Sequence, residues 1–342
     1  MRIILALVIT IFQAQYGDAF LIEDLSSGKH FLVDCGFKLT YKQHIKKKTK
    51  SADFIILTHS DEDHINGAFP LLEDYPASFS LSKVYVNSPE SVPLPRTSGE
   101  ISVLQANSLV KLLSKKAVPF EGLIQGQVLD VSEYLSLEVI SPTSGDLECY
   151  YEKYKAALNS ALPDKNETDI SSNVVTKSIT DWAGLPDSFL KKSDDIANTS
   201  SIAFILKYKN KRVLFLADSH PEVISDYFQR QGFSAEKKAE FDYIKLSHHG
   251  SAKSISKQLL SMISCNNFII STNGGKARSK HPSVETIAKL ATLVDRNNND
   301  EINFYFNHSI SAIETRNGPL LSLDERLLYK IKYIEQNEIR LT

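Results

Sequence analysis

The chain has 342 residues, 42% of them hydrophobic and 23% charged, which excludes collagen-like, low-complexity and intrinsically disordered classes of protein. Its 39 Lys and Arg against 41 Asp and Glu give a formal charge of −2, which excludes a strongly basic nucleic-acid coat but leaves room for a local basic groove. Cys35, Cys149 and Cys265 form no Cys-x-x-Cys pair, so a disulfide framework is not expected and a reducing, cytoplasmic location is.

The first predicted elements are three strands near the N-terminus. Val8–Gln15 is rich in Val, Ile and Phe, ends at a turn and returns as Ala19–Glu23, and His30–Asp34 follows a Ser-Ser-Gly-Lys turn. The basic start and the short apolar run also fit a signal peptide, although the run is too short to span a bilayer. We favour the strand, because removing it would leave the following strand of the hairpin unpaired.

The rest of the first half alternates strands and helices. Asp53–Thr58 is a largely apolar run that ends in polar residues, as a fully buried strand does. Helical spacing follows at Ile65–Tyr75 and Ile101–Lys116. Strands are predicted at Lys83–Val86 and Ser136–Ile140.

A polar segment separates this series from a second one. Residues Cys149 to Ala197 are rich in Lys, Asp, Asn and Ser, with local helical pieces and no strand pattern, so we interpret them as an insert or lid within one domain of residues 1–342. A charged tail is predicted from about Asp324. Later helices are predicted to begin at Pro221 and at Pro282, and another is predicted near Ser254–Ile263. Strands are predicted at Ile202–Tyr208, Arg212–Ala217, Tyr243–Leu246, Phe268–Ser271, Ile302–Phe306 and Leu328–Ile334.

Two strand-rich halves with interspersed helices predict an α/β fold, a sandwich of two sheets with helices outside.

The candidate functional residues are densest after the strand Asp53–Thr58, where the sequence reads His-Ser-Asp-Glu-Asp-His from His59 to His64. An acidic helix N-terminus would explain one or two carboxylates, but not histidine on both sides. Alternation is expected to place His59, Asp61 and Asp63 on one side of an extended turn, where they can converge on cations.

Two later strands also end in potential metal ligands. Asp218 follows the apolar strand Arg212–Ala217, and His248 and His249 follow Tyr243–Leu246. Open α/β sheets place their sites at such strand ends. Taken singly, Asp218 fits a helix cap and the two histidines fit a solvated turn, but with the first motif they favour a metal site.

These motifs resemble those of the metallo-β-lactamase superfamily, whose signature is His-x-His-x-Asp-His after a strand. The sequence is most similar to the metallohydrolase domain of the bacterial DNA-uptake protein ComEC and its standalone relatives. The matching stretches run nearly from end to end: Phe12 to Ala19 with its Gly-Asp turn, Leu32 to Gly36, His59 to Gly67, Asn198 to Ser201, Ala217-Asp218, Ser247-His248-His249-Gly250-Ser251 and His281-Pro282.

The resemblance implies a metallo-β-lactamase-type αββα sandwich with two divalent ions, Zn²⁺ or Mn²⁺, between the sheets. Our hypothesis gives Asp218 to both ions as a bridge. The other expected ligands are His59 and Asp61 for one ion, and Asp63, His64 and His248 for the other.

Three residues are candidates for the catalytic step. Asp63 is expected to orient the attacking water. His249 has three open roles: ligand, partner of His248, or turn residue. His281 is expected to bind a phosphate or protonate the leaving oxygen, with a surface histidine ahead of a proline as the alternative.

The sequence departs from the superfamily pattern at two points. Asp61 stands where the signature has its second histidine, as in the ComEC-like group. The usual third-motif histidine has no counterpart, because Ile65–Ala217 contains no histidine. One metal position is therefore expected either to be poor in protein ligands or to use water, substrate or an Asp instead, which disfavours a β-lactamase or glyoxalase II of the usual type.

The resemblance predicts a metal-dependent phosphodiesterase or nuclease that uses a metal-bound hydroxide and belongs to a bacterial antiviral defence system. Nucleic acid or a nucleotide is the expected substrate, with no membrane association and with a partner subunit as an open possibility. One alternative is an ester, lactone or thioester hydrolase of the same fold. Another is a non-catalytic sensor or assembly subunit that keeps the fold.

Overall fold

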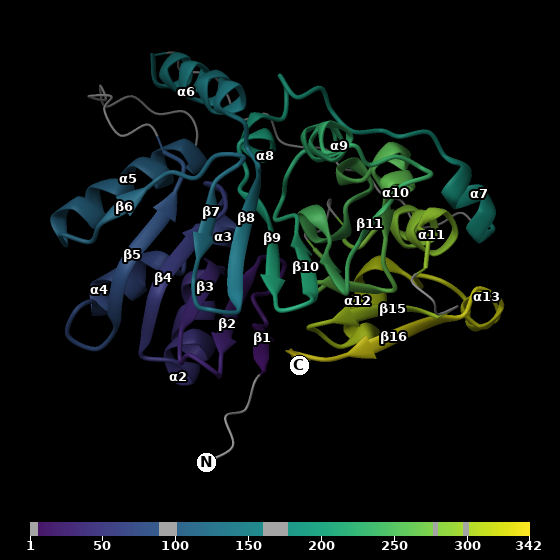
Figure 1. The fold of residues 1–342 in the computed structure, drawn as a ribbon, viewed down its shortest axis with the longest axis horizontal. Helices are drawn as coiled ribbons and strands as arrows, with labels where there is room; N and C mark the ends of the chain where they lie inside the picture. The colour runs from purple at the N-terminus through teal and green to yellow at the C-terminus, as the bar shows by residue number, and fades with distance from the viewer. Residues whose placement is uncertain (1–5, 89–100, 160–176, 276–279, 297–300) are drawn as a thin grey trace.

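The structure is a computed structural model that describes residues 6–88, 101–159, 177–275, 280–296 and 301–342. Within these residues, two large β-sheets pack face to face and helices cover their outer sides. In Figure 1 most of the N-terminal half (purple to blue) lies on the left and most of the C-terminal half (green to yellow) on the right. The predicted α/β sandwich is confirmed.

The first sheet has seven strands among the described residues, in the order β17-β1-β2-β3-β4-β5-β6. β3 and β4 are parallel, so their C-terminal ends lie at the same edge. The strands are β1 (Leu7–Ile11), β2 (Ala19–Asp24), β3 (His30–Cys35), β4 (Ser51–Leu57), β5 (Ser80–Val86), β6 (Phe120–Glu121) and β17 (Glu338–Leu341).

The second sheet has eight described strands, in the order β16-β15-β14-β12-β10-β9-β8-β7. β10, β12 and β14 are parallel and also end at a common edge. The strands are β7 (Val128–Asp130), β8 (Leu135–Ser141), β9 (Ala203–Tyr208), β10 (Lys211–Phe215), β12 (Tyr243–Lys245), β14 (Asn267–Ile270), β15 (Ile302–Phe306) and β16 (Ile331–Glu335). A separate pair joins β11 (Ala239–Glu240) and β13 (Ile263–Ser264).

Helices on both outer faces complete the four layers. The first sheet packs against α4 (Ala68–Asp74) and α5 (Ile101–Lys115), and the second against α9 (Pro221–Arg230), α10 (Lys257–Met262) and α11 (Val284–Leu293). The other described helices are α1 (Lys38–Thr40), η1 (Tyr41–Ile45), α2 (Lys46–Lys48), α3 (Glu62–Ile65), α6 (Ser144–Asn159), α7 (Ile179–Gly184), α8 (Ile196–Thr199), η2 (Ser247–Gly250), η3 (Ala252–Ser254), α12 (Ile310–Asn317) and α13 (Leu323–Leu328).

Apolar side chains explain why the strands stack in this way. Alternate residues of β2 point to opposite faces, so Phe20 enters the cluster between the sheets while Leu21 packs under the helices of the first sheet. The ring of Phe20 lies 5.5 Å, edge to face, from that of Phe215 on β10. This contact joins the two sheets directly below the strand ends that carry the candidate site.

Most predicted elements form, with two instructive differences. The predicted helix Ile65–Tyr75 is wrong as a single element, because α3 ends at Ile65 and α4 begins at Ala68. The break lies at Gly67, whose N–H donates to Gly36 O at 2.7 Å, and a Cβ there would lie 2.1 Å from Cys35 O. The predicted strand Leu328–Ile334 is wrong in its first residues, because α13 extends to Leu328.

The insert and the tail can be placed in part. The predicted insert includes most of α6 and all of α7, while residues 160–176 lie outside the described part of the chain. The segment from Asp324 includes most of α13 and then two strands. β16 belongs to the second sheet and β17 to the first. The division of the chain into a domain, an insert and a tail stays a prediction. No described helix has the length and apolar character needed to cross a membrane.

Candidate metal centre

The His59–His64 segment is positioned by the end of β4 and the start of α3. Asp61 is the extended residue before the helix (φ −70°, ψ 147°), and its carbonyl accepts the N–H of His64 at 3.0 Å. The predicted alternation therefore stops at Asp61, because Glu62 already begins a helix. The helical turn brings His64 beneath the end of β4, where His59 also lies, and their ring centroids are 4.1 Å apart.

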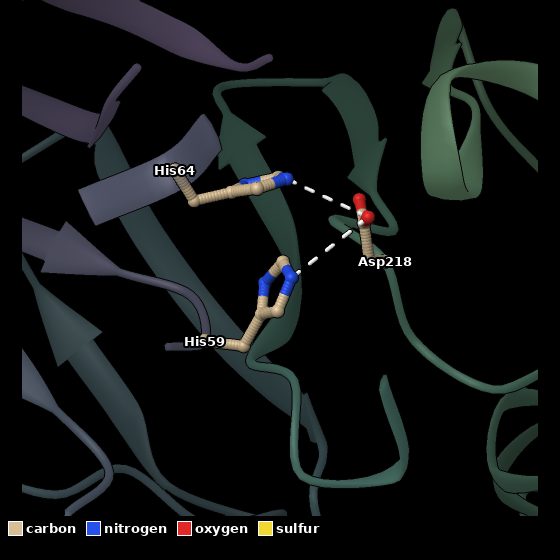
Figure 2. Close-up of side chains that lie close together, drawn as sticks. All are labelled: His59, His64 and Asp218. Atoms are coloured by element: carbon tan, nitrogen blue, oxygen red, sulfur yellow. Dashed lines mark ion pairs between the residues drawn. The ribbon is translucent and has the colours of Figure 1, made fainter. Parts of the chain in front are cut away.

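Asp218 is the point at which the two halves of the chain meet. Its Oδ2 lies 3.8 Å from His59 Nε2 and 3.5 Å from His64 Nε2, as Figure 2 shows. The same oxygen lies 3.6 Å from His248 Nδ1 and 3.9 Å from His249 Nε2. Two carboxylates flank this group: Asp61 Oδ2 is 3.5 Å from His59 Nε2, and Asp63 Oδ2 is 3.5 Å from His249 Nε2.

These separations suit ligands of an ion better than direct hydrogen bonds. A hydrogen bond between such groups is usually shorter than about 3.2 Å. Two ligand atoms that each lie about 2.1 Å from a tetrahedral Zn²⁺ are roughly 3.4 Å apart. Among the described residues, three groups of side chains lie close enough to hold an ion: His59–His64–Asp218, Asp63–His64–His249 and Asp18–Asp34–His64.

Hydrogen bonds to Nδ1 fix which nitrogen of each imidazole carries the proton. His64 Nδ1 lies 2.7 Å from Asp34 Oδ2, and His249 Nδ1 lies 2.8 Å from Ser271 O. Both oxygens can only accept, so both Nδ1 atoms donate. Thr58 Oγ1 donates to Asp34 Oδ2 at 2.8 Å, which leaves it as the acceptor for His59 Nδ1 at 3.1 Å.

The three Nε2 atoms are then left with lone pairs and no hydrogen-bond partner. Nε2 of His59, His64 and His249 is buried and makes no hydrogen bond, and the same holds for Asp218 Oδ1. Buried polar atoms without partners are costly, and several that face one another require a shared partner. A divalent cation fits this donor set, because imidazole lone pairs and carboxylate oxygens from three segments of the chain converge on one place.

Electrostatics give the same answer. Burial lowers the pKa of His64, but Asp218 and Asp34 outweigh it and hold the pKa well above its ordinary value. Burial likewise lowers the pKa of His249, but Asp18 and Asp218 raise it to about 9. Burial raises the pKa of Asp63, but His249 and His64 hold it below its usual range. Without an ion, the site therefore draws in protons to balance its carboxylates.

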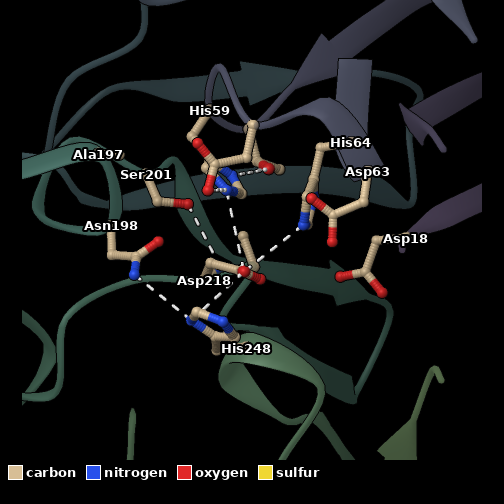
Figure 3. Close-up of polar contacts among 12 residues, drawn as sticks. Asp18, His59, Asp63, His64, Ala197, Asn198, Ser201, Asp218 and His248 are labelled. Atoms are coloured by element: carbon tan, nitrogen blue, oxygen red, sulfur yellow. Dashed lines mark hydrogen bonds and ion pairs between the residues drawn. The ribbon is translucent and has the colours of Figure 1, made fainter. Parts of the chain in front are cut away.

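His248 and His249 occupy different positions although they are adjacent. Both have left-handed backbone conformations, with φ of 46° and 56°, so their side chains diverge. His249 is buried against Asp63, whereas the side chain of His248 is 22% exposed and its Nδ1 lies 3.4 Å from Asn198 Nδ2. Figure 3 shows His248 between Asn198 and Asp218, on the side away from His64.

His281 also lies at this site. Its ring centroid is 5.5 Å from that of His248 and 6.4 Å from that of His249, and its buried Nδ1 makes no hydrogen bond. Burial, with help from His248 and His249, holds its pKa well below the usual value. The structure thus brings together every predicted site residue, and their individual roles stay predictions: His59, Asp61, Asp63, His64, Asp218, His248, His249 and His281.

Asp34 and Asp18 also lie at the centre, although neither was predicted as a site residue. Asp34 orients His64 directly and His59 through Thr58. Asp18 lies near Asp63 and His64 in Figure 3, and its Oδ1 is 3.4 Å from His249 Nδ1. The available signal was position, because Asp34 lies at the end of β3, the parallel neighbour of β4.

Two paired sheets with candidate metal ligands at one edge are consistent with the metallo-beta-lactamase fold. The family model of the metallo-beta-lactamase superfamily matches residues 13–274, and the chain belongs to that superfamily. Its members are metal-dependent hydrolases that generally bind divalent metals, usually zinc. A comparison with curated proteins gives no match.

Several solved structures are similar in fold. They include the metallo-beta-lactamase fold protein YhfI from Bacillus subtilis, with 11% identity over 98% of this chain and 99% of that chain and a TM-score of 0.44. Zn²⁺-bound PqqB from Methylobacterium extorquens has 10% identity over 98% and 99%, with a TM-score of 0.46. A putative metal-dependent hydrolase from Parabacteroides distasonis has 11% identity over 96% and 93%, with a TM-score of 0.41.

Proposed function

We propose that this chain is a phosphodiesterase or nuclease that depends on two divalent ions. The observation that carries the proposal is the convergence of three unpartnered imidazole Nε2 atoms on Asp218. In our assignment, His59, Asp61 and Asp218 hold one ion. Asp63, His64, His249 and Asp218 hold the other.

His249 replaces His248 in this assignment for a geometric reason. The His249 Nε2 lone pair faces Asp63 at 3.5 Å, and its Nδ1 is occupied by Ser271 O. His248 instead has Asn198 beside its Nδ1 and a partly exposed ring. We therefore place His248 at the open side of the centre, where it can contact a substrate oxygen.

The donor set favours phosphoryl over acyl substrates. Three carboxylates, from Asp61, Asp63 and Asp218, contribute to the proposed ligand set, and no histidine of Ile65–Ala217 adds a further imidazole. An oxygen-rich set suits Mn²⁺ as well as Zn²⁺. Ions held there would lower the pKa of water and neutralise the charge that grows on phosphate oxygens.

The chain's own residues would divide the remaining tasks. Asp63, held ionised by its histidine neighbours, orients the attacking water. His281 is kept uncharged by burial, so one ring nitrogen can donate a hydrogen bond to the leaving oxygen while the other accepts, and the proton that the leaving oxygen takes up would come from water. Asn198 holds the Nδ1 side of the His248 ring, and His248 can donate a hydrogen bond to a phosphate oxygen from its other ring nitrogen.

Nucleic acid or a nucleotide is the proposed substrate class, on the strength of the sequence resemblance to the ComEC-like domain. The same resemblance supports a cytoplasmic role in antiviral defence, with a partner subunit. The near-neutral charge of −2 disfavours tight binding to a duplex, so single strands and small nucleotides are the preferred candidates.

The test is an activity panel on the purified chain with Mn²⁺ or Zn²⁺. Labelled single-stranded DNA, RNA and bis-nitrophenyl phosphate are compared with a set of carboxylic esters and thioesters. We expect phosphodiester cleavage that is lost in H64A and kept in H30A, a histidine at the opposite end of β3 from Asp34. Ester turnover alone, or cleavage that survives H64A, contradicts the proposal.

A further inference from the structure

Lys245 is a buried lysine behind the candidate metal centre that the proposed reaction does not use. It is the last residue of β12, and 1% of its side chain is exposed. An ammonium at this depth costs several kcal/mol unless it is paired. Its Nζ forms an ion pair with Asp18 Oδ2 and donates to Ala217 O at 3.2 Å.

The Asp18 contact links Lys245 to His249 and Asp63. Asp18 Oδ1 lies 3.4 Å from His249 Nδ1, on the opposite side of the imidazole from the Nε2 that faces Asp63. The Asp18 N–H donates to Asp63 O at 3.2 Å. Gly17, before it, packs so closely that a Cβ there would lie 2.0 Å from Asp63 O. The Asp18 carboxylate is thus held between Lys245 and His249, and the backbone of residues 17 and 18 packs against that of Asp63.

The Ala217 contact links the same ammonium to Asp218. Ala217 adopts a left-handed conformation with φ of 47°, which is unfavourable for a residue with a Cβ and must be held by its surroundings. Its carbonyl accepts from Lys245 Nζ at 3.2 Å and from the His248 N–H at 3.0 Å. Asp218 is the next residue, so these bonds set the direction of its carboxylate.

We propose that Lys245 is a positioning residue. It aligns Asp218 and His249 with Asp63, so that these side chains can bind the ion that we assign to Asp63, His64, His249 and Asp218. The inference rests on the proposed metal-dependent function. Lys245 touches neither ion nor substrate in this role; it acts through Asp18 and through the Ala217 carbonyl. Replacing Lys245 should therefore lower the affinity for the ion held by Asp63, His64 and His249 more than the affinity for the ion held by His59 and Asp61.

The experiment compares K245M with K289M as a matched control. Lys289 on α11 is the other lysine that is almost fully buried among the described side chains, and it pairs with Asp187 at 2.9 Å and Glu285 at 2.7 Å beneath the outer helices. Both substitutions remove a buried ammonium and keep a long apolar side chain. Only K245M removes it from behind the metal centre.

Zn²⁺ binding is measured by equilibrium dialysis with elemental analysis, alongside urea unfolding of each metal-free protein. We expect two ions in the wild type and in K289M, and at least a tenfold loss of affinity for one ion in K245M. Should K245M not fold, D18N/K245M removes both charges and leaves no unpaired carboxylate. It should show the same metal defect, because Ala217 O still lacks the hydrogen bond from Lys245.

The outcomes separate this inference from the function on which it rests. A folded K245M or D18N/K245M that binds two ions with wild-type affinity overturns the role of Lys245. An equal loss of affinity in K289M also overturns it, since the effect would then follow from any lost buried ammonium. A wild-type chain that binds no metal refutes the proposed function instead.

Discussion

Replacing Asp34 with asparagine tests whether hydrogen bonding sets the proton position on the candidate ligands. Asp34 Oδ1 accepts the Thr58 N–H at 2.8 Å, while Oδ2 accepts from Thr58 Oγ1 at 2.8 Å and from His64 Nδ1 at 2.7 Å. Asparagine keeps one acceptor and turns the other into an NH₂ donor. Because the Thr58 N–H cannot change, the NH₂ should face Thr58 Oγ1 and His64.

The consequence falls on His64 Nε2. To accept from the new NH₂, His64 must move its proton to Nε2, which removes the lone pair that an ion needs. We expect zinc affinity to fall about 10- to 100-fold, equivalent to about 1.4–2.8 kcal/mol, as for other groups that orient metal ligands. The free energy of unfolding of the metal-free protein should fall by about 1–3 kcal/mol.

The matched control is D24N. Asp24 is also 1% exposed, and its carboxylate accepts hydrogen bonds from the Oγ atoms of three serines at 2.6 Å each: Ser26, Ser27 and Ser132. It lies at the end of β2 that is far from Asp34 and the metal centre. The D24N protein should therefore be less stable than the wild type but bind zinc with the same affinity. Zinc affinity is measured by competition with a chelating dye and stability by urea unfolding. Equal zinc affinity in D34N and the wild type would refute the reasoning about His64.

Three further predictions concern the same centre. Removing metal with a chelator should lower the melting temperature, because an ion at about 1,000 times its Kd adds about 4 kcal/mol to stability; an unchanged calorimetric transition would contradict this. With the pKa of His249 at about 9 in the ion-free site, an ion must displace a proton below that pH, so zinc affinity should rise with pH and level off near 9. Calorimetry in buffers of different ionisation enthalpy should detect the released proton, and pH-independent affinity argues against it. G17A should reduce both zinc affinity and stability, because its Cβ would lie 2.0 Å from Asp63 O, whereas G184A, with no neighbour within 4 Å, should match the wild type in both assays.

Local patterns were enough to predict most strands and the meeting of distant motifs. The apolar runs of β4, β10 and β12 each end in polar residues, and parallel strands place such ends at one edge of a sheet. The pairing of β17 with β1 was not predicted, because Glu338–Leu341 is a short polar-apolar segment whose partner lies more than 300 residues away. Its place depends on sheet completion rather than on local preference.

The helix boundaries show the limit of periodicity. Ile65–Tyr75 has continuous helical spacing, yet the helix breaks at Gly67 because the backbone must pass against Cys35 at the end of β3. No local signal announces a close approach between segments that are 32 residues apart, since it arises only when the layers pack. The same packing supplies the Asp34 contact that orients His64.

The amino-acid sequence by itself determined the donor types and their location at strand ends, because side-chain chemistry and hydrophobic patterning are local properties. Which donor faces which was decided by the tertiary structure. His248 and His249 are neighbours in sequence, and only their left-handed backbone turns one toward Asp63 and leaves the other near Asn198. The proton positions on His64 and His249 likewise depend on Asp34 and Ser271, which folding brings beside them, and that on His59 depends on Asp34 through the neighbouring Thr58.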